Sequence, residues 1–300
     1  MDRRKFILSS VSVLGVVPLA KFGRANAASS PIRFGIITDM HYAERPPNIH
    51  RYYRQSLGKT AECVQLMNEQ KVDFLVEIGD LKDEGTNPNE TQTLGFLDRI
   101  EAELQRFKGP LYHVLGNHDA DSISKQQFLA HIRNHGFSEA RNYYAFDQGA
   151  FHFVVLDANY TAKGIAYDHG NFDWKDAYIP QEQLTWLTED LKNNKKPTIV
   201  FVHQQLDSSA FEDAHKVYCP ANADEVRSIL EKSGKVLVVF QGHYHPGSFH
   251  KINGIYYYTL RGVIEGDGPQ NNSYAIVEVG SDRVIRIKGY RKAESQVLGQ

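Results

Sequence analysis

The sequence predicts one α/β domain in which two β-sheets face each other and helices cover their outer sides. Short apolar runs that end in turn residues alternate with amphipathic segments along the chain, and such runs are typical of strands in sheets covered on both faces. No proline-rich linker, low-complexity segment or internal repeat divides the sequence. A single layered domain therefore fits best.

The first 27 residues have the layout of a removable export signal. Arg3 and Arg4 form a twin-arginine pattern, an apolar stretch covers residues 11–20, and Ala25-Asn26-Ala27 is a small-x-small cleavage site. An ordinary basic N-terminus and a membrane anchor are the alternatives, but the apolar stretch is too short to span a bilayer comfortably. We expect a signal peptide at 1–27, a mature domain at 28–300, twin-arginine (Tat) export machinery as a partner, and a periplasmic or secreted product without a stable membrane anchor.

The composition argues against a nucleic-acid partner. The 300 residues carry 34 Lys and Arg against 36 Asp and Glu, and this net charge of −2 provides no basic field. Cys63 falls on a predicted helix face and Cys219 in a polar loop. They either pair in an oxidising compartment or remain one buried thiol and one loop thiol. Neither has the spacing of a thiolate metal site.

Helices are predicted from apolar residues at spacings of three or four and from capping residues at their first turns. The expected helices are 52–68, one opened by Asn89-Glu90-Thr91-Gln92, one from Ser124 to about His135, one from Pro180, and 221–232.

Strands are predicted from apolar runs that lie between turn residues. Five buried strands are expected at 34–37, 74–78, 111–115, 198–202 and 236–240. Further strands are expected at 142–146 and 151–156, which flank a hairpin turn, and at 249–252, 255–260, 273–279 and 283–290.

Each of the five buried strands is followed by residues with metal-binding chemistry. In strand order these are Asp39 and His41; Asp80; Asn117 and His118; His203; and His243 and His245. Active sites of open α/β sheets lie at strand ends, and this set of donors suits a pair of divalent transition metals that hydrolyses a phosphate ester. Singly, each has a simpler reading as a turn aspartate or a hydrogen-bonded loop residue. All of these residues except His118 are candidate ligands, and the occurrence of seven candidate ligands in one order argues against coincidence.

With Asp39-Met40-His41, Gly79-Asp80, Gly116-Asn117-His118-Asp119, His203 and Gly242-His243-Tyr244-His245, the chain resembles the calcineurin-like metallophosphoesterase superfamily. The match covers almost the whole mature chain. The resemblance implies a four-layer sandwich of two mixed β-sheets flanked by helices, and a centre of two divalent metal ions, either Mn, Fe or Zn.

The resemblance also implies roles for these residues. One metal would be held by Asp39, His41 and His245, the other by Asn117, His203 and His243, with Asp80 bridging them. A metal-bound hydroxide would attack phosphorus, and His118 would protonate the leaving oxygen. In some branches an aspartate at the place of Asp83 hydrogen-bonds that histidine, while the alternative for Asp83 is a solvated loop acid.

Departures from other branches narrow the class. Purple acid phosphatases carry tyrosine where Asp83 stands and lack a histidine at His41, and protein Ser/Thr phosphatases have arginine where Glu84 stands. Residues 34–43 and 51–57 instead resemble the manganese-dependent ADP-ribose/CDP-alcohol diphosphatases, which often carry glutamine at His41. In the second segment, Arg51 and Arg54 either bind phosphate or begin a solvated helix.

The segment Asn159–Tyr178 is rich in aromatic residues that either stack on a base near the metals or pack on the sheet edge.

We predict an exported hydrolase, a dinuclear metallophosphoesterase that cleaves phosphoester or phosphoanhydride bonds in small phosphorylated, nucleotide-like substrates. The alternatives are a phosphodiesterase of cyclic-nucleotide or phospholipid type, and a non-catalytic binding protein that keeps the fold. A binding protein would be expected to lack ligands, and here all are present.

Overall fold

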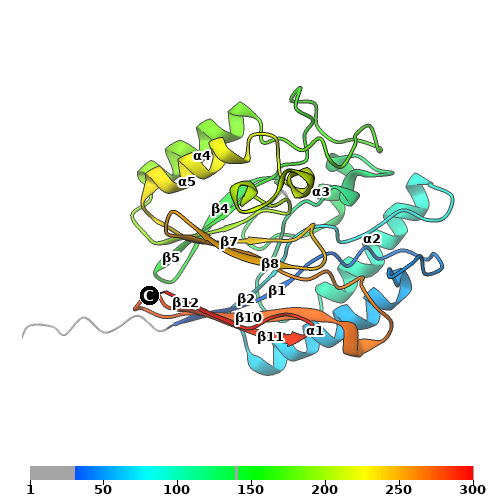
Figure 1. The fold of residues 1–300 in the computed structure, drawn as a ribbon. Helices are drawn as coiled ribbons and strands as arrows, with labels where there is room; N and C mark the ends of the chain where they lie inside the picture. Colours follow the sequence, from blue (N-terminus) through cyan, green and yellow to red (C-terminus); the bar gives the residue numbers. More distant parts are fainter. Residues whose placement is uncertain (1–30, 139–140, 300) are drawn as a thin grey trace, which may run out of the picture.

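Two six-stranded β-sheets face each other in the computed structural model, and helices cover the outer face of each sheet (Figure 1). The model describes residues 31–138 and 141–299. This is the four-layer α/β sandwich that the sequence predicts. The expected export signal at 1–27 lies outside the described residues. None of the described helices is both long enough and apolar enough to cross a membrane.

The first sheet is mixed and joins strands from the two ends of the described chain. Its strands in spatial order are β12 (Gln296–Leu298), β11 (Ile285–Arg291), β10 (Ser273–Val279), β1 (Ile32–Ile37), β2 (Phe74–Glu77) and β3 (Leu111–His113). β1, β2 and β3 run parallel, whereas β10, β11 and β12 each run antiparallel to their inner neighbour. β12 was not predicted, because three residues at the chain end are too few to show a pattern.

The second sheet is also mixed. Its strands in spatial order are β4 (Tyr144–Gln148), β5 (Phe151–Val155), β6 (Thr198–Phe201), β7 (Val236–Gln241), β9 (Ile255–Thr259) and β8 (Ser248–Ile252). The four central strands run parallel, and an antiparallel hairpin partner closes each edge. All these strands were predicted.

Five α-helices lie on the outer faces of the sheets. They are α1 (Ser56–Gln70), α2 (Glu90–Leu104), α3 (Lys125–His131), α4 (Gln181–Asn193) and α5 (Ala223–Ser233). The Ser124 hydroxyl and the Gln127 side chain form the predicted capping box of α3, which ends earlier than expected. Asn89 caps α2 by accepting a hydrogen bond from Gln92 N.

Short 3-10 helices lie mainly in the loops that follow the strands. They are η1 (Tyr53–Gln55), η2 (His118–Ala120), η3 (Ser208–Ala210), η4 (Asp213–Tyr218) and η5 (Pro269–Asn271).

Three apolar layers hold the sandwich together. One lies between the first sheet and α1 to α3, one between the two sheets, and one between the second sheet and α4 and α5. In the middle layer Phe34 stacks on Phe74 at 4.8 Å between ring centroids and meets Phe153 of the second sheet edge-on at 5.7 Å. Aromatic pairs of this kind add to the stabilisation from burial, so the layer fixes the sheets relative to each other.

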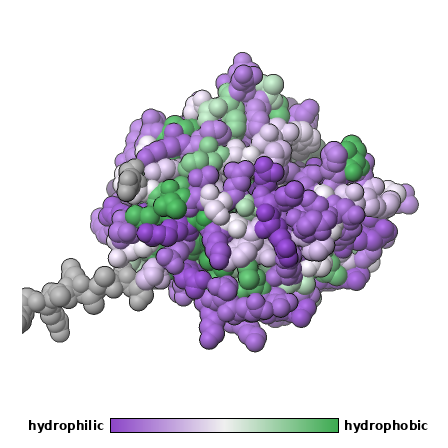
Figure 2. All heavy atoms as spheres, turned by 60° about the horizontal axis from the view of Figure 1, so that its bottom comes forward, coloured by the Kyte–Doolittle hydropathy of each residue, from purple (hydrophilic) through white to green (hydrophobic). Residues whose placement is uncertain are grey.

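The surface and the cysteines complete the fold. Hydrophilic side chains cover most of the face drawn in Figure 2. Cys63 and Cys219 are both free, which agrees with the interpretation that they do not form a disulfide. Both are buried, including Cys219, which was expected in a polar loop.

Candidate active site

The predicted site residues converge at one edge of the sandwich, where both sheets contribute. The loops after β1, β2 and β3 of the first sheet carry Asp39, His41, Asp80 and Asn117, and those after β6 and β7 of the second carry His203, His243 and His245. Each of these side chains is buried or nearly so. Parallel strands end at the same edge of a sheet, which explains how segments far apart in sequence meet.

The backbone of several of these residues is strained. Ten non-glycine residues of the described chain have positive φ, and four of them are candidate ligands: Asp39 (55°), His41 (46°), Asp80 (57°) and His243 (67°). Left-handed backbone costs a non-glycine residue on the order of 1–3 kcal/mol and concentrates at functional sites. The turns after β1, β2 and β7 thus give up backbone stability to direct a ligand.

Two glycines make room for this packing. A Cβ on Gly116 would lie 2.2 Å from both Asp80 N and Asp80 Oδ1. A Cβ on Gly79, whose φ is +93°, would lie 2.5 Å from His203 Nδ1. A side chain at either position would clash with the site, which explains why these two positions of the motifs are glycines.

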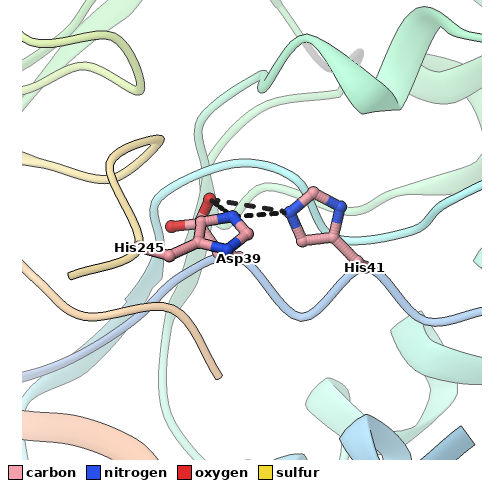
Figure 3. Close-up of side chains that lie close together, drawn as sticks. All are labelled: Asp39, His41 and His245. Atoms are coloured by element: carbon pink, nitrogen blue, oxygen red, sulfur yellow. Dashed lines mark hydrogen bonds and ion pairs between the residues drawn. The ribbon is translucent and has the colours of Figure 1, made fainter. Parts of the chain in front are cut away.

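Asp39, His41 and His245 form one group of candidate ligands (Figure 3). His41 Nε2 and His245 Nε2 face each other at 3.1 Å, and Asp39 Oδ1 lies 3.7 Å from His41 Nε2 and 3.3 Å from His245 Nε2. Burial acts to raise the pKa of Asp39, but His245, His41 and His203 outweigh it and hold the pKa well below its usual range. The carboxylate is therefore ionised and points at two imidazoles.

Asp80, His203 and His243 form a second group. Asp80 Oδ2 lies 3.1 Å from His203 Nε2 and 3.4 Å from His41 Nε2, so this carboxylate lies between the two groups. His203 Nδ1 donates to Ile78 O at 2.8 Å, which leaves Nε2 as the donor atom that faces the site. Such a hydrogen bond fixes the tautomer of a metal-binding histidine.

Unpartnered polar atoms test whether these residues fit a metal. Asn117 Oδ1 and His243 Nε2 are buried and have no hydrogen-bond partner within the described chain, and the buried His203 Nε2 has only the Asp80 carboxylate at 3.1 Å. Burial and the neighbouring His203 lower the pKa of His243 to about 3, so its ring is neutral, the form that binds a metal. A buried polar atom left unpaired costs on the order of 1–3 kcal/mol. The donor set, with nitrogen, carboxylate and amide oxygen, fits divalent transition metals.

His118 lies beside the first group, its ring centroid 4.6 Å from that of His41. Its Nδ1 is 3.6 Å from both Asp83 Oδ2 and Asp121 Oδ2. Burial acts to lower the pKa of His118, but Asp83, Asp80 and Asp121 outweigh it and raise the pKa to about 9.

Asp83 does not form the expected hydrogen bond to His118. Its Oδ2 lies 3.3 Å from His41 Nδ1, within hydrogen-bond distance, and the distance to His118 is longer. Asp121, which the sequence analysis did not single out, is the second carboxylate beside His118. It is held by an ion pair with Lys82, whose side chain is fully buried. Asp121 lies three residues after His118, and that spacing was the only sequence signal.

Two further acids support the site and were also missed. Asp119 accepts hydrogen bonds from the backbone nitrogens of Gly116, Asp80 and Leu81 at 2.8 to 3.0 Å and so ties two loops together. Glu265 Oε1 lies 2.6 Å from His245 Nδ1 and orients that ring. Asp119 belongs to the Gly-Asn-His-Asp motif, whereas nothing in the sequence marks Glu265, which is 20 residues from its partner.

A cavity of about 310 Å³ opens onto these groups. Besides the candidate ligands and His118, it is lined by Arg51, Trp174 and Tyr218. The Trp174 and Tyr218 rings lie 5.3 Å apart, and each is 5.6 Å from the ring of His243. Arg54 instead pairs with Glu44 at 3.0 Å, so of the two arginines considered for phosphate only Arg51 reaches the cavity.

Residues of the segment Asn159–Tyr178 fit both interpretations in part: some pack within the loop and one lines the cavity. Tyr167 is buried and stacks on Phe172 at 3.8 Å, which is packing within the loop. Trp174, a few residues on, lines the cavity. Tyr218, on η4, was not considered from the sequence.

Comparison with known proteins identifies the same family as the motifs in the sequence. Residues 32–247 match the family model described as calcineurin-like phosphoesterase. The manganese-dependent ADP-ribose/CDP-alcohol diphosphatase of Oryza sativa subsp. japonica is 26% identical over 88% of this chain and 93% of that protein. The human protein of the same name is 23% identical over 88% and 92%.

The fold has a match among solved structures. A dimetal phosphatase from Danio rerio superimposes with a TM-score of 0.76 and 22% identity over 90% of this chain and 99% of that one. The likeness confirms the predicted fold.

Proposed function

Because the chain belongs to the calcineurin-like phosphoesterase family and is thus a metal-dependent phosphoesterase, we propose that it cleaves phosphoanhydride or phosphodiester bonds in small nucleotide-like molecules. The observation that carries this proposal is the single cavity that brings candidate ligands, a proton donor and two aromatic rings together. The relatives named as ADP-ribose/CDP-alcohol diphosphatases support the substrate class.

The two groups of ligands would hold two divalent ions. We assign Asp39, His41 and His245 to one ion, Asn117, His203 and His243 to the other, and Asp80 to both. When bound, two such ions neutralise phosphoryl oxygens and activate the attacking water. Manganese fits the carboxylate, imidazole and amide donors and is the metal in the relatives' names.

His118 supplies the proton for the leaving oxygen in this proposal. The carboxylates of Asp83, Asp80 and Asp121 raise its pKa, which favours the protonated ring. It lines the cavity, so the proton is accessible to a bound substrate. General acid catalysis of this kind is worth roughly 10²–10⁴-fold in rate.

Trp174 and Tyr218 would bind the base, and Arg51 would bind a phosphate oxygen. The two rings lie on the His243 side of the cavity, so a base against them places its phosphates toward the candidate ligands. Stacking of a base on an aromatic side chain is worth about 1–3 kcal/mol where it has been measured for single-stranded nucleic acids.

The test is a comparison of kcat/KM with manganese for ADP-ribose, CDP-choline, cyclic AMP, 4-nitrophenyl phosphate and a phosphoserine peptide. We expect the two diphosphates to be the best substrates. Trp174→Ala should raise KM for them, Trp174→Phe should restore it, and Trp186→Ala on α4, outside the cavity, should leave it unchanged. If the diphosphates are the poorest substrates, the proposed substrate class is wrong and only the family activity stands.

We also propose export by the twin-arginine route, on the pattern at Arg3 and Arg4. Replacing both arginines with lysine should leave the precursor in the cytoplasm of a bacterial host. Normal export of that variant would contradict the proposal.

A further inference from the structure

A second cavity of about 400 Å³ lies beside the metal cavity. The two cavities share His245 as a lining residue, and the neighbours His50 and Arg51 line one each. Ligand sites in proteins typically measure 300–1,000 Å³. Because both linings include His245, a molecule bound at the candidate ligands would lie next to the second cavity.

The second cavity is built directly against the candidate ligands. Gly262, in its lining, packs so closely that a Cβ there would lie 3.0 Å from His245 Cγ and 3.2 Å from Asp39 Cβ. Arg261, the preceding residue, also lines the cavity, and a Cβ on Gly247 would lie 2.8 Å from its Cγ. The loop after β7 thus leaves space for the arginine stem beside the ligand His245.

Two of the three charged side chains that line this cavity, Arg261, Lys292 and Glu265, are positive. Arg261 and Lys292 line it together with His50. The Arg261 Nε atom is buried and has no hydrogen-bond partner within the described chain. The buried Lys59 donates hydrogen bonds to the carbonyl oxygens of Glu265 and Gly266, two residues that line the cavity.

Two acids lie nearby and offset part of this charge. Glu265 lines the cavity, but its carboxylate is bonded to His245 Nδ1 at 2.6 Å. Glu294 lies 3.4 Å from Arg261 Nη2, and both side chains are partly exposed, so that pair is weak. An arginine fork with a free Nε–H and a nearby ammonium is the arrangement that binds the oxygens of a phosphate group.

We propose that this cavity is an anion-binding subsite, centred on Arg261 and Lys292, for a phosphate group other than the one being cleaved. It rests on the proposed function insofar as the anion belongs to the substrate. That phosphate is either a second phosphate of the substrate or free inorganic phosphate. The site adds selectivity for a charge remote from the scissile bond, which the metal ligands alone cannot provide.

The first arm of the test uses two pairs of substrates whose members differ by one phosphate. The pairs are ADP-ribose and ADP-ribose 2′-phosphate, and dephospho-coenzyme A and coenzyme A. The readout is the ratio of kcat/KM between the two members of a pair, for the manganese-loaded enzyme. Arg261→Gln and Lys292→Gln should each reduce the preference for the phosphorylated member by about tenfold or more, through KM. Arg286→Gln on β11 and Lys195→Gln, whose residues line neither cavity, should leave the ratio unchanged.

The second arm measures inorganic phosphate binding to the same manganese-loaded proteins by titration calorimetry. If free phosphate is the ligand, the wild type and Arg286→Gln should bind phosphate at two sites, and Arg261→Gln at one. A change in the first arm alone identifies a substrate phosphate, and a change in the second alone identifies free phosphate. No change in either arm for both Arg261→Gln and Lys292→Gln overturns the subsite.

Failure of the proposed function gives a different result. If no diphosphate is cleaved but Arg261→Gln still loses one phosphate site, the subsite stands and the substrate class falls. Two independent variants keep the test valid if one of them fails to fold, which thermal unfolding would reveal.

Discussion

The domain has two buried clusters of histidine and carboxylate, one at the strand ends of both sheets and one between β3 and α2, and they differ in how the ring nitrogens of their histidines are hydrogen-bonded. In the metal cluster, which comprises the seven candidate ligands, His243 Nε2 has no hydrogen-bond partner within the described chain, and His203 Nε2 has only the Asp80 carboxylate at 3.1 Å. In the His113 cluster (Glu101, His113 and Asn134), His113 has Asn134 Oδ1 at 3.1 Å from Nδ1 and Glu101 Oε2 at 2.9 Å from Nε2. Burial is common to both clusters, so it does not identify a ligand, whereas an unpartnered ring nitrogen does.

The hydrogen bonding of the rings separates a cluster that serves stability from one that serves chemistry. A satisfied buried imidazole stabilises the fold, while an unsatisfied one costs on the order of 1–3 kcal/mol until something binds it. Changes in the metal cluster should therefore affect metal content and turnover, and changes in the His113 cluster should affect stability alone.

Metal removal should have the largest effect. Chelation should reduce activity to background and also lower the free energy of unfolding, because unpaired donors remain in the site. Free manganese at 100 times its Kd should restore about 2.7 kcal/mol for each site. Activity and urea unfolding with and without manganese measure this. His113→Gln should show the same difference on chelation, and a metal-free protein as active and stable as the loaded one would contradict the prediction.

His118→Gln should have the next largest effect. It should lower kcat by roughly 10²–10⁴-fold for substrates with poor leaving groups and by less for 4-nitrophenyl phosphate, which needs less protonation. Asp83→Asn and Asp121→Asn should cause smaller losses of the same kind. Steady-state kinetics on both substrate types gives the answer, and an equal loss on both would mean that His118 acts through structure or metal binding.

Glu265→Gln should weaken manganese binding by about 10–100-fold, because a carboxylate on the far nitrogen of a histidine ligand orients the ring and raises its basicity. Glu101→Gln is the matched control, since it removes the same type of bond from His113 and should leave manganese affinity unchanged. Manganese titration followed by activity measures both. Equal affinities for the two variants would remove the distinction between the clusters.

Glu101→Gln should have the smallest effect on turnover but should lower the free energy of unfolding by about 2–3 kcal/mol near pH 5.5. Burial alone would raise the pKa of Glu101 and lower that of His113. The charge interaction and hydrogen bond between the two groups outweigh burial, so the pKa of Glu101 is lowered and that of His113 is raised. The Glu101 contribution is lost as pH falls through its lowered folded value.

The His113 contribution is complete below its unfolded pKa of about 6.5 and is lost as pH rises through its raised folded value. Urea unfolding of the wild type and Glu101→Gln at pH 5.5 and pH 9 should therefore show a smaller difference at the higher pH. A difference that grows with pH would contradict the assignment.

The sequence predicted the layers and the ligand set because both depend on patterns local to a strand and its end. Phe34 to Ile37 and the following Asp39 are an example: the apolar run defines β1, and the carboxylate follows within two residues. The missed residues depend on tertiary contacts instead. Glu265 meets His245 through a loop whose backbone bonds to Thr38 and Asp39, just after β1, and Tyr218 reaches the cavity from η4, where no periodicity exists to indicate it.

The strained backbone was also beyond prediction. Asp39, His41 and Asp80 adopt left-handed φ values that local preference disfavours, and only the surrounding packing imposes them. By contrast, the glycines that allow this packing stand in the motifs themselves, at Gly79 and Gly116.

Each group of candidate ligands takes residues from both sheets, and His41 and His245 are 204 positions apart in the chain. A bound ion would therefore act as a cross-link between the two halves of the sandwich, and neither coordination sphere can exist before the sheets have docked. Contacts of such long sequence separation form late in folding. Manganese uptake should consequently be among the last steps of refolding, so that its rate reports the moment at which the two halves come together.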